Sequence, residues 1–476
     1  PRNHRRRRHL MQLPILSGIY TDEAAQVRTS YPRNMIPVPK KSGISEGYLR
    51  HTDGIVKVAD GPGIDRGGIN WNGVMYRVMG TSLVSIAEDG TYTTIGDVGL
   101  GDQVTLDYSF DHLGESSGGR LYFWDGTTFA QNTDPDLGTV LDFVWIDGYF
   151  LTTDGSYLVV TDLNSPFLVN PLKYGSSEAN PDPVKGVNKV RNELVALNRY
   201  TIEFFDNIGG DFFPFSRIEG AQINKGCVGT YTHCVVNDLV CFMGSGFNEA
   251  ISVYIGINGT IQKIASSEID QRIAEYTEAV LAESICEYKI YNGHIHIMFH
   301  LPDQTIVYDL SASQAVGDHI WYTMDSGTTT PAEYLARNHV HCYDRWNVSD
   351  PTSTQFGYLT DTISTHWGNM IGWEFSTQIV YNEGAGAIFH SLELVATTGR
   401  IALGVDPKIS TQYSLDGYTW SIDRYISAGK IGERTKRLVW FIQGHMRNWR
   451  IQRFKGTSDA MISVSRLEAK LEPLYV

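Results

Sequence analysis

The stretch from Asn292 to Tyr322, NGHIHIMFHLPDQTIVYDLSASQAVGDHIWY, decides the fold of this chain. Two runs in which apolar and polar residues alternate lie on either side of Pro302 and Asp303. The apolar positions are Ile295, Ile297 and Phe299 in the first run and Ile306, Tyr308 and Leu310 in the second. Alternation with a period of two around a Pro-containing turn predicts an antiparallel β-hairpin, followed by a polar loop and the start of another strand.

The same pattern recurs along the chain from about Gly54 onward. Short alternating runs are separated by Asn-Gly and Asp-Gly pairs, which favour the tight turns of hairpins. About seven units, each with three or four short strands, predict an all-β fold with a β-propeller-like body over residues 54–370. A large barrel and stacked sandwiches are alternatives, because no fixed signature marks each unit. The units are 68–99, 104–138, 140–163, 185–208, 227–264, 283–324 and, more weakly, 332–367.

The pattern changes after Gly372, where the alternating runs become longer. About eight such runs predict a C-terminal β-sandwich over residues 371–476. One helix is predicted, over Ser267–Ala282, with Ser267 as its N-cap. The runs of the sandwich include EFSTQIVY, HSLELVATTG, KISTQYSLDGYTWSIDRYIS, KRLVWFIQGHMRNWRIQRFKG and AMISVSRLEAKLE.

The N-terminus differs from the repeating pattern. Residues 1–12 contain the Arg5–Arg8 run, and Met11 resembles a natural start, so we interpret this segment as a non-native or disordered extension. A basic arm that touches nucleic acid is the alternative, and the sequence does not decide whether residues 1–10 are native. Residues 13–53 are rich in proline and predict an extended arm on the surface of its own or a neighbouring subunit.

Charge is distributed unevenly over the 476 residues, whose formal net charge is −14. Residues 1–12 carry +5, residues 13–370 carry −22 and residues 371–476 carry +3. A body this acidic repels DNA phosphates, which argues against a phosphate-gripping module. The body could still line a tube through which DNA slides, and ordinary solubility charge is the other interpretation.

Cysteine usage and hydropathy indicate a protein made in a reducing cytosol. An odd number of cysteines without a CxxC pair argues against a disulfide framework and a zinc ribbon, and favours buried free thiols. No apolar window long enough for a membrane span and no signal peptide are recognised. The cysteines are Cys227, Cys234, Cys241, Cys286 and Cys342.

Several motifs could carry chemistry, and each has a structural interpretation that we favour. GESSG at 114–118 matches the GxSxG nucleophile motif, but a strand follows it where the motif needs a helix. SLDGYTW at 414–420 is one residue short of a sialidase Asp-box and is interpreted as an Asp-Gly turn. Alternate histidines on one strand could share Zn²⁺ or Fe²⁺, although no acid joins them on that face. The histidine sets are His294, His296 and His300, and His339 and His341 with Cys342.

We therefore assign no catalytic, cofactor-binding or metal-binding residue. A carbohydrate-binding or sialidase-like propeller is the alternative function, in which aromatic residues stack on sugars in an axial pocket. A metalloprotein that uses the first histidine set is a third, weaker hypothesis. The candidate aromatic residues are Trp71, Trp124, Trp145 and Trp321.

Ordered segments of the chain resemble the packaged-DNA stabilization proteins of short-tailed bacteriophages, which form the tail hub, or nozzle. The matching segments keep their order and spacing from about residue 45 to 455. They are 45–57 (SEGYLRHTDGIVK), 74–83 (VMYRVMGTSL), 198–210 (NRYTIEFFDNIGG), 224–233 (NKGCVGTYTH), 294–314 (HIHIMFHLPDQTIVYDLSASQ), 414–426 and 437–456.

This resemblance implies a structural virion protein and not an enzyme. It implies copies of the chain, expected to be six, in a ring below the portal and its adaptor, with a needle plugging the lower end and tailspikes around it. The ring would retain packaged double-stranded DNA and give it a conduit for ejection without sequence-specific binding. We expect the acidic excess of residues 13–370 to face the channel in part, and the basic residues 371–476 to face an acidic neighbour.

Overall fold

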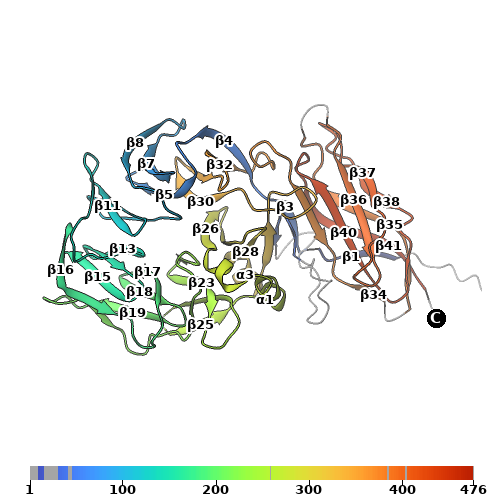
Figure 1. The fold of residues 1–476 in the computed structure, drawn as a ribbon. Helices are drawn as coiled ribbons and strands as arrows, with labels where there is room; N and C mark the ends of the chain where they lie inside the picture. Colours follow the sequence, from blue (N-terminus) through green and yellow to red (C-terminus); the bar gives the residue numbers. More distant parts are fainter. Residues whose placement is uncertain are drawn as a thin grey trace, which may run out of the picture.

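The computed structural model describes residues 9–15, 31–40, 46–257, 259–382, 385–401 and 405–474. Within these ranges, seven sheets of four or five strands form a propeller, and two further sheets form a sandwich beside it (Figure 1). The predicted β-propeller-like body and C-terminal β-sandwich are therefore confirmed. In the same ranges, no helix is long and apolar enough to cross a membrane.

The propeller blades follow one another along the chain, and their innermost strands surround a common axis. Blade one contains β5 (Asp65–Trp71), β6 (Val74–Met79), β7 (Ser82–Ile86) and β8 (Tyr92–Asp97). Blade two contains β9 (Thr105–Tyr108), β10 (Leu113–Ser117), β11 (Arg120–Trp124) and β12 (Phe129–Gln131). Blade three contains β13 (Asp142–Ile146), β14 (Tyr149–Thr153), β15 (Tyr157–Asp162) and β16 (Ser165–Ser176). Blade four contains β17 (Val184–Val190), β18 (Glu193–Asn198), β19 (Ile202–Asn207) and β20 (Phe215–Arg217).

Blade five has an inner position shared by two short strands, and blades six and seven have four strands each. Blade five contains β21 (Gly226–Cys227), β22 (His233–Val236), β23 (Leu239–Ser245), β24 (Ser252–Ile257) and β25 (Thr260–Lys263). Blade six contains β26 (Ile285–Tyr291), β27 (His294–His300), β28 (Thr305–Asp309) and β29 (Trp321–Met324). Blade seven contains β30 (Arg337–Cys342), β31 (Arg345–Ser349), β32 (Gln355–Thr360) and β4 (Gly54–Asp60).

The ring is closed by a strand that comes from the start of the body. β4 precedes blade one in sequence but pairs antiparallel with β32 of blade seven. The outer strand of the last blade thus lies far from the other three in sequence. This explains why the last predicted unit, residues 332–367, shows a weaker pattern than the others.

Several predicted hairpin turns have the left-handed backbone that their residues favour. Asn72 and Gly73 have φ values of 54° and 79°, and Asp147 and Gly148 have values of 50° and 90°. Positive φ at both central residues is the conformation of a type I′ turn, which suits the twist of the flanking strands. The Asn-Gly and Asp-Gly pairs therefore set the hairpin registers at these positions.

The deciding stretch folds as β27, a tight turn, β28, a helix and β29. The apolar positions predicted to share a face do so, because Ile297, Phe299 and Ile306 are buried in one core cluster with Trp321. The predicted polar loop contains a helix, α3 (Leu310–Val316), whose N-terminus is capped by the Asp309 carboxylate.

The predicted helix over residues 267–282 is two short helices, α1 (Ser267–Ile273) and α2 (Glu278–Ala282). Ser266, not Ser267, is the N-cap of α1, and its hydroxyl accepts a hydrogen bond from the backbone N–H of Ile269. Thr277 has an extended backbone and separates the two helices.

The sandwich consists of two antiparallel sheets that enclose an apolar core. Trp373, Phe375 and Phe454 stack between the sheets, with Trp440 tilted against Phe454. One sheet contains β1 (His9–Leu13), β2 (Met35–Pro39), β3 (Gly47–His51), β41 (Ser463–Pro473), β35 (Ala387–Ala396), β38 (Leu438–Phe441) and β39 (His445–Met446). The other contains β33 (Gly372–Ser376), β34 (Val380–Tyr381), β40 (Trp449–Thr457), β36 (Lys408–Ser414) and β37 (Arg424–Ser427).

The N-terminal segment differs from the predicted extension and arm. Residues 1–8, with the arginine run, lie outside the described residues, but His9–Leu13 form β1 and pair with β41. Within the segment 13–53, β2 and β3 are ordered strands of the sandwich. The proline pattern of β2 is compatible with this because β2 is an edge strand, where a missing N–H costs no ladder hydrogen bond.

Residues next to β2 join the two domains. The Arg33 guanidinium donates two hydrogen bonds to the buried carboxylate of Asp325, the Nη2 bond being 2.7 Å. The backbone of Arg33 exchanges hydrogen bonds with Glu374 of β33, and Asn34 donates to the Gly372 carbonyl at 2.7 Å. Buried polar contacts of this kind constrain the relative position of the domains.

Candidate functional site

The innermost strands of the seven blades enclose a cavity on the propeller axis. Its volume is about 520 Å³, and residues of β5, β9, β13, β17, β22, β26 and β30 line it. Acidic, basic and histidine side chains lie among apolar ones on its wall. The cavity is therefore where the fold brings candidate functional residues together.

On one side of the cavity a lysine links three neighbouring blades. Lys189 of β17 lies 2.9 Å from the Asp107 carboxylate of β9 and donates to the Trp145 carbonyl of β13 at 2.7 Å. Its ammonium also lies 5.3 Å from the centre of the Trp145 ring. These contacts connect blades two, three and four.

Asp142 of β13 makes a second connection between the same blades. Its carboxylate accepts hydrogen bonds from the Thr105 hydroxyl at 2.6 Å and from the backbone N–H of Val187 at 2.9 Å. Burial raises the pKa of Asp142 to about 7, although both hydrogen bonds oppose the shift. A carboxyl group that titrates near neutrality could act in proton transfer, but both of its oxygens are engaged by neighbouring blades.

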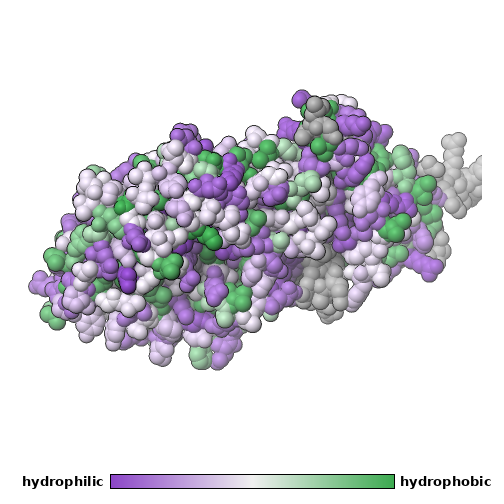
Figure 2. Space-filling view, turned by 45° about the horizontal axis from the view of Figure 1, so that its top comes forward, coloured by the Kyte–Doolittle hydropathy of each residue, from purple (hydrophilic) through white to green (hydrophobic). Residues whose placement is uncertain are grey.

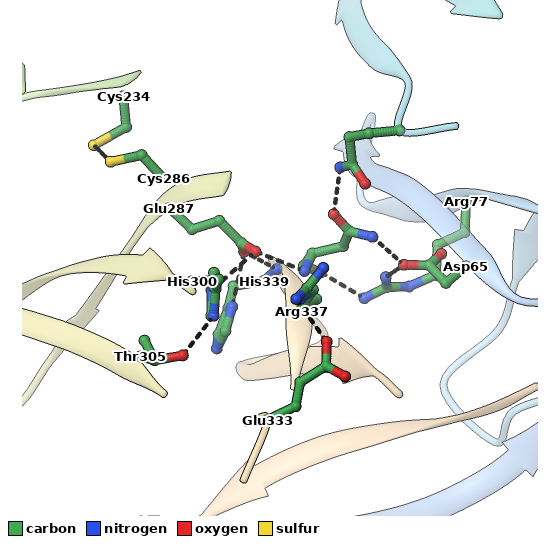
Figure 3. A network of polar contacts seen from close by, with 12 residues as sticks. Asp65, Arg77, Cys234, Cys286, Glu287, His300, Thr305, Glu333, Arg337 and His339 are labelled. Carbon is green, nitrogen blue, oxygen red and sulfur yellow. Dashed lines mark hydrogen bonds and ion pairs between the residues drawn. The ribbon is translucent and has the colours of Figure 1, made fainter. Parts of the chain in front are cut away.

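Blades one and seven are joined by a buried network beside the cavity (Figure 3). The Asp65 carboxylate accepts from Arg77 at 3.0 Å and from the Asn338 amide at 2.6 Å. Burial raises the pKa of Asp65 to about 6, against the opposing effect of Arg77. Gln103 in turn donates to the Asn338 side chain at 2.6 Å, which extends the network to blade two.

Blades six and seven meet at a carboxylate that contacts two imidazoles (Figure 3). Glu287 of β26 lies 2.8 Å from His339 Nδ1 of β30 and 3.3 Å from His300 Nε2 of β27. Burial alone would raise the pKa of Glu287, but the two histidines outweigh it and hold this pKa well below its usual range. Glu287 also accepts from the backbone N–H groups of Asn338 and His339.

The structure does not bring the predicted histidine sets together as sets. His294 bonds Asp309 at 2.6 Å, and His296 lies 3.0 Å from the Tyr322 hydroxyl. The expectation that no acid joins the first set is wrong, because Asp309 of β28 and Glu287 of β26 reach it from the paired strands.

The second histidine set is divided as well. His339 bonds Glu287, whereas the ring of His341 packs against Trp346 with centroids 5.2 Å apart. Cys342 points into another core cluster and contacts the Gly73 carbonyl. The structure thus combines one histidine of each set, His300 and His339, around an acid that sequence reasoning does not include.

The other candidate motifs have structural roles. Ser116 of GESSG lies inside strand β10, and a Gly-Gly turn into β11 follows where a nucleophile motif needs a helix. Asp416 accepts hydrogen bonds from the backbone of Tyr418 and Thr419, as in an ordinary Asp-Gly turn. The four candidate tryptophans do not line the axial cavity; Trp71 and Trp321 are buried in separate core clusters.

Thr305, His300 and Glu287 follow one another in the order of a nucleophile, a base and an acid. Thr305 Oγ1 lies 2.9 Å from His300 Nδ1, and His300 Nε2 faces Glu287. Thr305 is 0% exposed, however, so a substrate cannot reach its hydroxyl. This geometry supports a structural or metal-binding role better than nucleophilic catalysis.

Comparison with protein families gives two consecutive matches. Residues 11–364 match the family model described as "Bacteriophage P22 Gp10, beta-propeller", and residues 372–472 match "Bacteriophage P22 Gp10, beta-sandwich". The chain belongs to this family. Together the two models cover both domains of the structure, and the family agrees with the resemblance noted in the sequence.

Among curated proteins, the "Tail hub protein gp10" of Salmonella phage P22 is 26% identical over 486 residues. The alignment covers 97% of this chain and 100% of that protein. Among solved structures, the Neurospora crassa Pan2 WD40 domain is 10% identical with a TM-score of 0.42, covering 65% of this chain and 95% of that one. A computationally designed protein, Ika8, is 10% identical with a TM-score of 0.40, covering 65% of this chain and all of that one.

Proposed function

We propose that this member of the P22 Gp10 family is a structural tail hub protein of a short-tailed phage. Copies of it form a ring, expected to be six-membered, below the portal and its adaptor. The ring retains packaged DNA and forms the conduit for its ejection, and it carries a needle and tailspikes. The protein is made in the cytoplasm of the host bacterium, resides in the virion and acts without catalysis.

The observation that carries this proposal is the end-to-end relationship to a tail hub protein. The similarity spans both domains and 97% of the chain. It therefore includes the order of propeller and sandwich and is not limited to one domain. The contacts of Arg33 with Asp325 and Glu374 hold the two domains together. A part of a pressurised conduit needs such a fixed geometry.

Exposed apolar groups support a role in assembly. Figure 2 shows hydrophobic residues interspersed with polar ones on the visible face, including the end formed by the sandwich. Phe441, the last residue of β38, and Ile442, which follows it, are 69% and 78% exposed. Ile442 has a φ of 56°, which is strained for a β-branched residue, and Arg424 donates to its carbonyl. Strain and apolar exposure at one turn are typical of a surface that a partner covers.

The charge distribution suits a conduit for DNA. Residues 13–370, which hold the propeller, carry −22. Lysine and arginine contacts to phosphates would slow DNA in a salt-dependent manner, whereas an acidic wall does not retain it. The proposal therefore includes a channel surface of net negative potential in the assembled ring.

Particle imaging of the purified protein, alone and with its portal adaptor, tests the proposal. Rings that form with the adaptor and have an acidic lumen are the expected result. A chain that stays monomeric with the adaptor, or a ring whose lumen is net positive, would contradict it. A monomer that cleaves or binds sugars would favour the carbohydrate alternative.

A further inference from the structure

Three side chains from two blades converge beside the axial cavity. Glu287 of β26 and His300 of β27 belong to blade six, and His339 of β30 belongs to blade seven. One possible ligand atom from each side chain lies within 4.8 Å of the other two. Figure 3 shows the Glu287 carboxylate at one edge of two nearly parallel imidazoles, whose planes differ by 17°.

Two ring nitrogens in this cluster are buried and lack a hydrogen-bond partner among the described residues. They are His300 Nε2 and His339 Nε2. His300 Nε2 is 3.3 Å from a Glu287 oxygen, yet the pair does not have hydrogen-bond geometry. Buried polar groups without a partner are rare in folded proteins, so His300 Nε2, which faces Glu287, calls for an explanation.

The two rings turn different nitrogens toward Glu287. His300 Nδ1 lies 2.9 Å from the Thr305 hydroxyl, which leaves Nε2 facing Glu287, whereas His339 turns Nδ1 to Glu287 at 2.8 Å. Histidines that ligate metals usually have their second nitrogen oriented by a carboxylate, carbonyl or hydroxyl partner. His300 is thus oriented in the manner of a metal ligand through Nε2, and His339 offers Nδ1 to the same carboxylate.

We propose that Glu287, His300 and His339 bind a divalent transition-metal ion of the Zn²⁺ or Fe²⁺ class. Two imidazoles and one carboxylate form a donor set that such ions accept, with a further coordination position for water. Glu287 and His339 line the axial cavity, so an ion can enter and water can complete the coordination from that side. The ion joins blade six to blade seven without taking part in a reaction.

The nearby cation Arg337 is paired with Glu333 at 2.6 Å.

A metal-free hydrogen-bonded cluster is the competing explanation. In that case Glu287 simply accepts hydrogen bonds from His339 and from two backbone N–H groups. This explains the positions of Glu287 and of His339 Nδ1 but leaves His300 Nε2 without a hydrogen-bond partner among the described residues.

The test measures Zn²⁺ binding to the full chain after treatment with a chelator. Calorimetry and elemental analysis are expected to find one Zn²⁺ per chain, and Co²⁺ in its place should give visible ligand-field absorption. His300→Gln and His339→Gln are expected to weaken Zn²⁺ binding at least about tenfold. His296→Gln, which replaces a buried histidine of the same strand outside the cluster, should leave binding unchanged.

Thermal unfolding gives a second readout. Saturating Zn²⁺ should raise the unfolding midpoint of the wild type and of His296→Gln, but not that of His339→Gln, because only the native site binds the ion. Mg²⁺, which prefers oxygen ligands, should raise neither. A folded wild type without stoichiometric Zn²⁺ binding, or His300→Gln and His339→Gln variants that bind as tightly as the wild type, would overturn the proposal.

Discussion

Replacing Glu115 by Gln is expected to stabilise the propeller by an amount that grows with pH. Glu115 lies in β10 of blade two and is 1% exposed. Neither of its carboxylate oxygens has a hydrogen-bond partner among the described residues. Burial raises the pKa of Glu115 from 4.5 to about 8, with Arg66 opposing the shift. The nearby Arg66 donates to the carbonyls of Asp102, Gly80 and Gly99 and to the Ser117 hydroxyl.

The sign follows from comparing the folded and unfolded chains. Below pH 4.5 the carboxyl group is protonated in both, so it adds no pH dependence. Between 4.5 and about 8 only the folded chain keeps the proton, so stability falls as pH rises and the loss is complete above 8. Each pH unit in this window is worth about 1.4 kcal/mol. The loss is therefore about 3 kcal/mol at pH 7 and roughly 5 kcal/mol above pH 8.

Glutamine has nearly the same shape and cannot ionise, so it removes this loss. Urea unfolding of the wild type and Glu115→Gln at pH 5, 7 and 8.5 measures the difference, which should be small at pH 5 and largest at pH 8.5. Glu219→Gln, at an exposed position, is the control and should show no pH-dependent difference. A Glu115→Gln difference that stays constant with pH, or a variant less stable than wild type at pH 8.5, would refute the reasoning.

The remaining expectations concern the domain junction, a thiol pair and the strained turn. Arg33→Ala leaves the buried Asp325 carboxylate without its ion-pair partner and should lower the unfolding free energy by about 3–5 kcal/mol. Lys57→Ala, in the exposed ion pair with Asp60, is the control and should lower it by less than about 1 kcal/mol. Equal effects of the two variants in urea unfolding would contradict this expectation. The Cys234 and Cys286 sulfurs lie 3.4 Å apart on the cavity wall, so oxidised glutathione should take two electrons from them, with loss of two protons, and join blades five and six by a disulfide. Peptide mapping should find this bond in the wild type and in Cys342→Ser but not in Cys286→Ser, and a pair that stays alkylatable argues against it. Changing Phe441 and Ile442 to Asp should leave the unfolding midpoint nearly unchanged and block assembly with tail partners in particle images; rings that still form would show that this turn is not an interface.

The blades were predictable because their information is local. Alternation within β27 and β28, and Asn-Gly or Asp-Gly pairs between strands, specify a hairpin without reference to the rest of the chain. The pairing of β4 with β32 was not predictable in this way, because neither strand carries a local signal for a partner so distant in sequence. Helix α3 had a signal that alternation obscured, since Asp309 precedes it as a cap and Gly317 ends it with a φ of 81°.

The site at the blade junction was predictable only in part. Hairpin register places Thr305 directly opposite His300, so this contact follows from the sequence of the hairpin. The meeting of His300 with Glu287 and His339 depends on how β26 and β30 lie around the axis. Histidine spacing along one strand therefore suggested the right residue type but the wrong partners, because the ligand set spans three strands.

Strand β2 lies in the segment that the sequence predicts as a surface arm, yet it packs into both domains. Met35 is buried in the sandwich core, whereas Ile36 is buried in a cluster with Met298 and Tyr322 of blade six. Successive side chains of a strand point to opposite faces, so one short edge strand packs into both domains. Arg33, just before β2, is bonded to Asp325 and adds a polar contact at this junction. The sandwich and blade six thus pack against the two faces of one strand, and such a junction suits the ring that we propose to hold packaged DNA.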